Sequence, residues 1–444
     1  MSLTGYEWND RETRENTDAN PNQFLANDYE DDAWQIDHRS ELTWRWGEGR
    51  ESVFGADFLM QELDVFNIQD NLTVDPTIPL VNRFDQTTQQ LGLYATTGFG
   101  LPRIGGGALG DFFSKFSVEG GARYDYAYQE FAHDVGISVT GGGSFATRNG
   151  TTEDDWDHVS GDVNLSYAIT ENHEVYFRYA HGWKPGQFNG GTIFNIQIVD
   201  KVRPEKVDAF EIGFRTNWWE GRLTLNVSGF IQDYRDLQIF QLAQDSFGYL
   251  IPQLLNADAE IRGFEWELAA TPIDGLEIRF GGAFLDTEYK DFGGPSQERL
   301  APSGIPPQII TTRIDYSGNP LIAAPRWSWN GSAEYELVLP RNLGSLVPRV
   351  SFSFRDDIFF DAAKGKGWQQ STDVGQFGET ATWLWNAGLR YHDPDRHFEI
   401  GGWVRNIFND SYKVQASGLT QSRFIGLEVY GDPRTYGLTA TFRY

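Results

Sequence analysis

The sequence predicts an all-β protein, and more specifically an antiparallel transmembrane β-barrel, from three observations. Apolar and polar residues alternate along most of the chain. The connections alternate between short turns and long polar segments, and aromatic residues gather near strand ends. No run approaches the roughly 18 consecutive apolar residues that a membrane-spanning helix needs. Strands are therefore the elements that we expect to cross the membrane.

The final segment, residues 434–444, illustrates the alternation. Tyr436, Leu438 and Phe442 fall on one face of an extended strand, and threonines and a glycine fall on the other. Such a strand can turn its apolar face to lipid and its polar face to a water-filled interior. We count about 16 strands of this kind, beginning with SLTGYEW at the start of the chain. We expect the final strand to lie antiparallel to residues 397–411.

The connections between these strands differ in length in a regular way. Short turns rich in Gly, Pro, Asn or Asp occur at 46–50, 169–173, 218–222, 271–275 and 392–396. Long polar segments occur between them at 10–32, 66–85, 131–156, 182–205, 237–256, 290–324, 361–379 and 411–433. Short periplasmic turns and long extracellular loops are typical of outer-membrane barrels. The glycine-rich stretch at 105–110 is expected to form a turn, not a phosphate-binding loop before a helix.

A soluble β-sandwich is the alternative fold. Its strands would be shorter, at about five or six residues, and its apolar faces would meet in a dry core. Here the polar faces are too open for such a core. Tryptophans near strand ends favour the barrel, because aromatic girdles mark the boundary between lipid and water. These tryptophans are Trp34, Trp44, Trp46, Trp218, Trp219, Trp327 and Trp329.

Composition excludes several functions. The net charge is −27, whereas nucleic-acid binding needs clustered Lys and Arg. The absence of cysteine excludes disulfides and Cys-ligated metal sites. The histidines are scattered, and no Ser/His/Asp or paired-carboxylate arrangement is visible, so we expect no enzyme, no cofactor and no metal site. The acidic segment 10–32 could hold Ca²⁺ or bridge to lipopolysaccharide through divalent ions, although a solvated loop is the default interpretation.

Five segments, in order, resemble signatures of TonB-dependent outer-membrane receptors. The first two are EVYFRYAHGWKPGQFNGG (174–191) and KVDAFEIGFRTNWWEGRLTLNVSGFIQDYRDLQI (206–239). The third is NADAEIRGFEWELAATPIDGLEIRFGGAFLDTEYKDF (256–292). WVRNIFNDSYKV (403–414) and the terminal PRTYGLTATFRY complete the series. The chain therefore resembles the C-terminal part of such a receptor's barrel.

This resemblance implies a barrel of 22 strands preceded by a plug domain, in the outer membrane of a Gram-negative bacterium. We expect residues 1–444 to supply about 16 of those strands, with the plug and the first strands absent. The start of the chain also lacks the basic and apolar regions of a signal peptide. The implied cargo is a scarce ligand, most commonly a ferric siderophore. The implied partners are the TonB complex, acting through the plug, and outer-membrane lipid and lipopolysaccharide. Without a plug, these residues alone are not expected to carry out energised uptake.

A 16-stranded general or substrate-selective porin remains the alternative function. Long segments at nearly every hairpin, in place of a single constricting loop, favour the receptor. For that receptor the candidate ligand-binding residues are Trp183, Phe188, Phe194, Trp368, Arg178 and Arg390. The aromatic rings could stack on a ligand, or they could serve only in the girdle and in loop packing. Strand parity places the two arginines toward the interior, where nearby glutamates could neutralise them.

Overall fold

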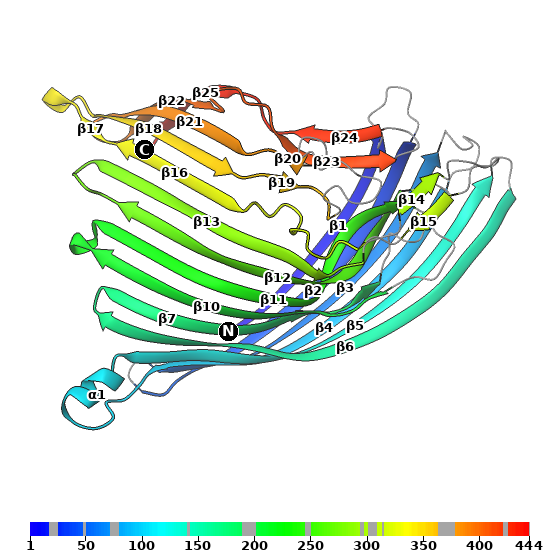
Figure 1. Ribbon diagram of the computed structural model, residues 1–444, viewed down its shortest axis with the longest axis horizontal. Helices are drawn as coiled ribbons and strands as arrows, with labels where there is room; N and C mark the ends of the chain where they lie inside the picture. The colour runs from blue at the N-terminus through cyan, green and yellow to red at the C-terminus, as the bar shows by residue number, and fades with distance from the viewer. Residues whose placement is uncertain are drawn as a thin grey trace.

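The computed structural model describes residues 1–16, 25–47, 50–71, 80–139, 143–188, 201–244, 250–293, 297–300, 309–312, 315–362, 378–420 and 425–443 (Figure 1). Nearly all of them belong to β-strands. Among the described residues, no helix combines the length and the apolar character that a membrane crossing requires.

One large antiparallel sheet of 17 strands dominates the structure. Its strands are β1 (Ser2–Asn16), β2 (Leu25–Arg45), β3 (Glu51–Asn71), β4 (Leu80–Gly100), β5 (Phe116–Val139), β6 (Gly143–Thr170), β7 (His173–Lys184), β10 (Glu205–Trp218), β11 (Leu223–Gln244), β12 (Leu250–Ala270), β13 (Leu276–Asp291), β16 (Trp327–Tyr335), β17 (Leu337–Val338), β18 (Ser345–Arg355), β21 (Thr382–His392), β22 (Phe398–Arg405) and β25 (Thr435–Phe442). Each of these strands pairs with the next one of the same sheet, except that β16 and the short β17 both pair with β18. The predicted all-β antiparallel fold, the strand count and the pairing of the final strand with 397–411 are confirmed.

Four two-stranded sheets lie in the described parts of the long connections. They are β8 (Gln187–Phe188) with β9 (Lys201–Val202), β14 (Gln297–Leu300) with β15 (Ile309–Thr312), β19 (Ile358–Phe359) with β20 (Gly378–Glu379), and β23 (Lys413–Thr420) with β24 (Ile425–Tyr430). Short 3₁₀ turns occur at Trp219–Gly221 and Pro340–Asn342. The connection from β4 to β5 contains a short helix, α1 (Gly107–Phe113). The prediction of a simple turn at 105–110 was therefore wrong, because this glycine-rich stretch leads into a single helical segment.

Four predicted loops are largely strand. The described parts of the segments 10–32, 66–85, 131–156 and 237–256 continue the ladders β1–β2, β3–β4, β5–β6 and β11–β12 in unbroken or nearly unbroken register. Cross-strand polar contacts accompany these extensions, such as Arg11 to Asp31 at 2.8 Å and the Tyr128 hydroxyl to Glu153 at 2.7 Å. A ladder surrounded by water needs no apolar face. The extensions therefore lack the alternation from which strands are predicted.

The two faces of the large sheet differ as predicted. On β25 the apolar side chains Tyr436, Leu438 and Phe442 are 80%, 83% and 70% exposed. In a barrel such an exposed apolar face is covered by lipid. Ring contacts join five strands on this face, with centroid distances of 4.7 Å from Phe284 to Trp327 and 4.6 Å from Phe354 to Trp383. With the contacts from β12 to β13 and from β16 to β18, they form a continuous aromatic band over β12, β13, β16, β18 and β21.

Side chains that are fully buried in protein cluster in a different place. Tyr289 and Phe292, at the end of β13, pack with Tyr316 in a cluster near the loops. Backbone hydrogen bonds hold the segment around Tyr316 there, including Tyr316 N–H to the Phe292 carbonyl at 2.8 Å. The side-chain amide of Asn319 donates to the Ala362 carbonyl at 2.6 Å. The protein core therefore lies at the loop end of the sheet, and the membrane-facing part relies on its backbone ladders.

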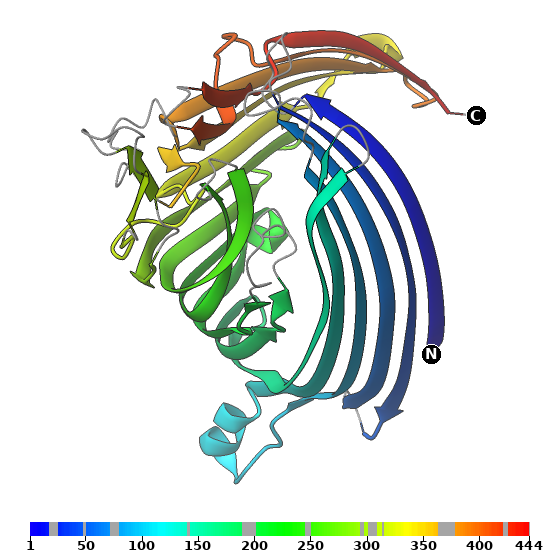
Figure 2. The ribbon, with the colours of Figure 1, turned by 90° about the vertical axis from the view of Figure 1, so that its right-hand side faces the viewer.

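The sheet is a curved wall with β1 and β25 at its two ends (Figure 2). Among the described residues, β1 pairs only with β2, and β25 pairs only with β22. The two terminal strands thus each present one unpaired edge.

Candidate functional site

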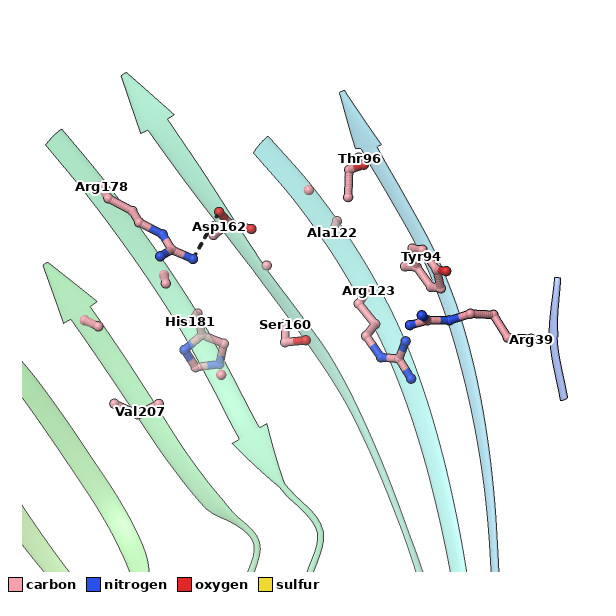
Figure 3. Close-up of a pocket in the computed structure, with 15 residues that line it drawn as sticks. Arg39, Tyr94, Thr96, Ala122, Arg123, Ser160, Asp162, Arg178, His181 and Val207 are labelled. Atoms are coloured by element: carbon pink, nitrogen blue, oxygen red, sulfur yellow. Dashed lines mark ion pairs between the residues drawn. The ribbon is translucent and has the colours of Figure 1, made fainter. Parts of the chain in front are cut away.

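A pocket of about 420 Å³ lies on the polar face of the sheet (Figure 3). Strands β2, β4, β5, β6, β7 and β10 contribute to it. We call it the wall pocket, and its polar lining residues are Arg39, Tyr94, Thr96, Arg123, Ser160, Asp162, Arg178 and His181. Alternation directs Tyr94, Arg123, Asp162 and Arg178 to the inner face. His181 has the opposite parity to Arg178 on β7 and lies where the β6–β7 ladder ends.

Arg123 is held in place by two carboxylates. Its Nη1 and Nη2 atoms donate to both oxygens of Asp57 on β3 at 2.6 and 2.7 Å, and its Nε donates to Asp125 at 2.7 Å. Bidentate arginine–carboxylate pairs are among the stronger hydrogen-bonded contacts in proteins. Gly92 on β4 makes the arrangement possible, because a Cβ there would lie 1.9 Å from Arg123 Nη2. Arg123 is therefore a structural tie across three strands.

Tyr94 forms the centre of the pocket floor. Its hydroxyl donates to Glu41 at 2.6 Å, and its ring lies over Gly55 on the neighbouring strand. The guanidinium carbons of Arg39 and Arg123 lie 5.8 and 5.5 Å from the ring centroid. Cation–π attraction of this kind keeps guanidinium groups near an aromatic face without using their N–H donors.

Of the three arginines that line the wall pocket, Arg39 and Arg178 have N–H donors that short ion pairs among the described residues do not use. Their side chains are 52% and 51% exposed, against 33% for Arg123. Each makes one long ion pair among the described residues, Arg39 with Glu41 at 3.9 Å and Arg178 with Asp162 at 3.6 Å. Planar guanidinium groups bind carboxylates and other oxyanions through paired N–H donors. The wall pocket can therefore bind an anionic ligand group although it also contains carboxylates.

The predicted site residues fall into different environments. Arg178 lines the wall pocket, and Trp183 lies further along the same strand, with its Nε1 3.4 Å from Asp125 Oδ2. Phe188 is only 5% exposed and packs against Phe131 and Trp156. This burial gives Phe188 a packing role, and its contact with ligand stays a prediction.

Arg390 lies on the polar face far along the sheet, and it does not line the wall pocket. Its Nη2 donates to both oxygens of Glu334 at 3.1 and 3.0 Å, and Arg349 shares that glutamate at 3.1 Å. Phe194 and Trp368 lie outside the described residues. The structure therefore brings Arg178 and Trp183 onto one strand and separates Arg390 from both.

Other arginines of the polar face are already engaged. Arg215 pairs with Glu174 at 2.9 Å, and Arg279 pairs with Glu277. The Arg405 guanidinium carbon lies 4.9 Å from the centroid of the Trp403 ring. Mutual neutralisation, the simpler explanation of these charges, holds for most of the wall. Arg39 and Arg178 differ from them because each lines the wall pocket and makes only one long ion pair among the described residues.

The sequence did not single out Arg39, Tyr94 or Arg123. A cross-strand signal exists, because Gly55 pairs directly with Tyr94, and Tyr94 pairs with Arg123. A glycine opposite an aromatic or long polar residue leaves room for that side chain to lie flat on the sheet. Reading this signal requires the pairing register, which alternation within one strand does not provide.

The signature segments converge at the loop end of β7, β10, β11 and β12. The Gln238 side chain donates to the Pro185 carbonyl at 2.8 Å, and its backbone N–H donates to Glu205 at 2.8 Å. Asn256 accepts from Arg203 N–H at 2.8 Å and donates to the Asp236 carbonyl at 2.7 Å. These hydrogen bonds form a network that fixes the start of the connection following Trp183.

A group of possible metal ligands lies in the short turn before β22, formed by Asp393, Asp395 and His397. The Asp393 oxygens already accept from Phe398 N–H at 2.6 Å and from Asp395 N–H at 3.3 Å. This group stabilises the turn through those bonds. Its position opposite the loop end separates it from the wall pocket.

Comparison with known proteins agrees with this architecture. A family model described as "TonB dependent receptor-like, beta-barrel" matches residues 2–407. The chain is 23% identical over 220 residues to a probable TonB-dependent siderophore receptor, PiuA, of Acinetobacter baumannii, covering 49% of this chain and 27% of that protein. It is 22% identical over 289 residues to the pesticin receptor of Yersinia pestis, covering 64% and 36%. The chain thus spans about a third of the length of these curated relatives.

Solved structures share the fold. The ferric yersiniabactin uptake receptor FyuA from Yersinia pestis superimposes with a TM-score of 0.72 at 18% identity, covering 99% of this chain and 58% of that one. The ferric citrate transporter FecA superimposes with a TM-score of 0.65 at 16% identity, with the same coverage. The matched family and these neighbours are transport receptors, not enzymes. The chain therefore belongs to the TonB-dependent receptor β-barrel family, whose members lie in the outer membrane of Gram-negative bacteria.

Proposed function

We propose that this chain forms the barrel wall of a receptor that takes up a ferric siderophore, driven by the TonB complex through a plug domain. The observation that carries the proposal is the pair of half-exposed guanidinium groups, Arg39 and Arg178, in a pocket on the inner face. Ferric chelates commonly present carboxylate, catecholate or hydroxamate oxygens, which such donors suit. Outer-membrane lipid and lipopolysaccharide surround the apolar face in this proposal.

Local donors matter here because the overall charge opposes an anionic cargo. The net charge of −27 repels anions at long range, but salt screens that repulsion within about 8–10 Å. Inside that distance the nearest groups decide whether an anion is attracted. In the wall pocket these groups are the two arginines and Tyr94, on strands from β2 to β7. The wall pocket is thus the part of the inner face best suited to an anionic chelate.

The test is uptake of ⁵⁵Fe-labelled catecholate, hydroxamate and citrate chelates by a receptor-deficient strain that expresses the complete receptor. We expect one chelate class to be taken up, and uptake to disappear in a strain without TonB. The double variant Arg39→Gln/Arg178→Gln should reduce that uptake at least about tenfold, since each lost charge-assisted contact is worth about 1.5–3 kcal/mol. Trp183→Ala should weaken chelate binding without reducing barrel assembly.

Arg279→Gln is the matched control, because Arg279 lies on the same face outside the wall pocket and is paired with Glu277. Its uptake should match that of the parent receptor. Uptake of small solutes independent of TonB would contradict the proposal and would fit the 16-stranded porin instead. Equal losses in the control and the double variant would show that the wall pocket has no special role.

A further inference from the structure

We propose that His158 and His181 form a binding site for a divalent first-row transition-metal ion such as Zn²⁺ or Cu²⁺. The site lies where β6 and β7 separate. Their ladder runs from Thr170 opposite His173 to Gly161 opposite His181 and ends there. Above that point β6 continues with β5, and β7 continues with β10. The two imidazole rings meet across this fork, with their Nε2 atoms 2.7 Å apart.

The neighbours of His181 fix which of its nitrogens carries a proton. Asp208, directly opposite on β10, accepts from His181 Nδ1 at 2.8 Å and from the Tyr179 hydroxyl at 2.7 Å. With its proton on Nδ1, the neutral ring directs the lone pair of Nε2 at His158. A carboxylate that holds the far nitrogen of a histidine is the usual support of a metal-ligating imidazole. His181 is therefore oriented as a ligand before any ion arrives.

His158 completes the pair from the other side of the fork. Without the ion, its Nε2–H donates to His181. When the ion binds, that proton moves through solvent to His158 Nδ1, and the neutral ring offers its Nε2 lone pair to the ion. Zn–N bonds of about 2.0–2.1 Å at a tetrahedral angle place two ring nitrogens about 3.3 Å apart, so binding requires an opening of about 0.6 Å. Small rotations of two partly exposed rings at a strand fork can supply this movement.

The surroundings leave room for further ligands and select the type of ion. His181 lines the wall pocket, so the fork opens onto a space of about 420 Å³ that can hold water or an oxygen ligand. The Trp183 ring packs beside His158, with centroids 5.4 Å apart, and shields that side. Imidazole nitrogens favour Zn²⁺, Cu²⁺ and Ni²⁺, whereas Ca²⁺ and Mg²⁺ prefer oxygen. Such an ion would join the start of the Trp183 connection to the β5–β6 hairpin.

The experiment uses the complete receptor purified from outer membranes in detergent, in a His397→Ala background that disables the turn group before β22. Zn²⁺ titration calorimetry should detect one ion, and the electron paramagnetic resonance spectrum of bound Cu²⁺ should show coupling to two nitrogens. His158→Asn and His181→Asn should each weaken binding at least tenfold. Asp208→Asn should weaken it about 10–100-fold while keeping both imidazoles. His38→Ala removes a histidine elsewhere and should leave the affinity unchanged.

Folding of each variant is checked by its heat-dependent shift in electrophoretic mobility. If a histidine variant fails to fold, Asp208→Asn and the Cu²⁺ spectrum of the background protein still decide. A background protein that binds no Zn²⁺, a spectrum without nitrogen coupling, or unchanged affinity in folded His158→Asn would overturn the site. The rings would then form only a hydrogen-bonded pair. This outcome is separate from siderophore uptake, because the proposed site does not depend on the cargo.

Discussion

Side chains lying flat over glycines organise the inner face at the scale of single residues. Tyr94 covers Gly55, and the Arg123 guanidinium covers Gly92 while it binds Asp57. In both cases a hydrogen in place of a side chain lets a longer residue of the neighbouring strand cross the sheet. These residues connect strands sideways, in addition to the backbone ladder, and they form the floor of the wall pocket.

Gly92→Ala is expected to lower the free energy of unfolding by about 1–3 kcal/mol, the usual range for overpacking. The new methyl group would lie 1.9 Å from Arg123 Nη2 and 2.7 Å from Asp57 Oδ1, so the bidentate pair must break or shift. Gly98→Ala is the matched control on the same strand, since its nearest neighbour is a Glu119 side-chain carbon at 3.6 Å. Guanidinium unfolding in detergent measures both. Equal midpoints for the two variants would contradict this account.

Strand parity predicted the face of the sheet on which a residue lies, but not which residues meet in one pocket. It correctly placed Arg178 and Arg390 on the polar face, because that prediction depends only on neighbours within one strand. It could not pair Arg178 with Arg39 in one pocket, because their strands are far apart in sequence. The burial of Phe188 also depended on a distant partner, Phe131. The sequence alone did not show which residues of different strands lie in contact.

At the scale of elements, alternation within one strand also fails to predict how far the hairpins extend beyond the membrane. The order of the strands followed from alternation, but their loop ends did not, because the extensions are held by cross-strand polar contacts. The β23–β24 hairpin is an example. Lys413 and Tyr430 both donate to Glu428, at 3.3 and 2.7 Å, and Lys413 N–H donates to Glu379 at 2.7 Å. The hairpin is thus held partly by ionisable groups.

The stability of this hairpin should depend on pH in two windows. The Tyr430 hydroxyl, followed by Lys413, lowers the pKa of Glu428, so stabilisation is complete above the ordinary glutamate range and is lost as pH falls through the lowered pKa. The same bond to Glu428 raises the pKa of Tyr430, so its contribution is lost as pH rises through the raised value. Protease cleavage of the hairpin, measured from acidic to alkaline pH, should therefore be slowest at intermediate pH.

Glu428→Gln should weaken both limbs of that profile, because the raised pKa of Tyr430 depends on the same bond. Tyr430→Phe should remove the alkaline limb and leave an acidic limb that depends on Lys413 and Glu428. A parent profile that is flat below about pH 4.5, the ordinary value for glutamate, would show that the hairpin does not depend on the charge of Glu428.

The sheet as a whole has two unpaired edges among the described residues. β1 offers the side of a 15-residue strand that faces away from β2, and β25 offers the side that faces away from β22. Unpaired strand edges are templates for pairing with another chain. The chain also covers only 58% of its solved neighbour FyuA. In the complete receptor we propose that further strands occupy both edges.

This arrangement predicts that the 444-residue chain, folded by itself in detergent, self-associates through β1 and β25. Light scattering coupled to size-exclusion chromatography should give a mass that rises with protein concentration. The complete receptor, measured in the same detergent, should remain a monomer because its edges are paired. A monomeric 444-residue chain at every concentration would show that the two edges pair with each other or are shielded.

The length of β6 sets how far the receptor stands above the cell surface. A strand of 28 residues rising about 3.3 Å per residue measures about 90 Å. At a tilt of about 40° it reaches a height of about 70 Å, whereas the hydrocarbon layer is about 30 Å thick. A strand of this height that starts at the inner edge of the hydrocarbon layer extends about 40 Å beyond its outer edge. Diffusing solutes would meet this protein surface before they reach the lipid boundary.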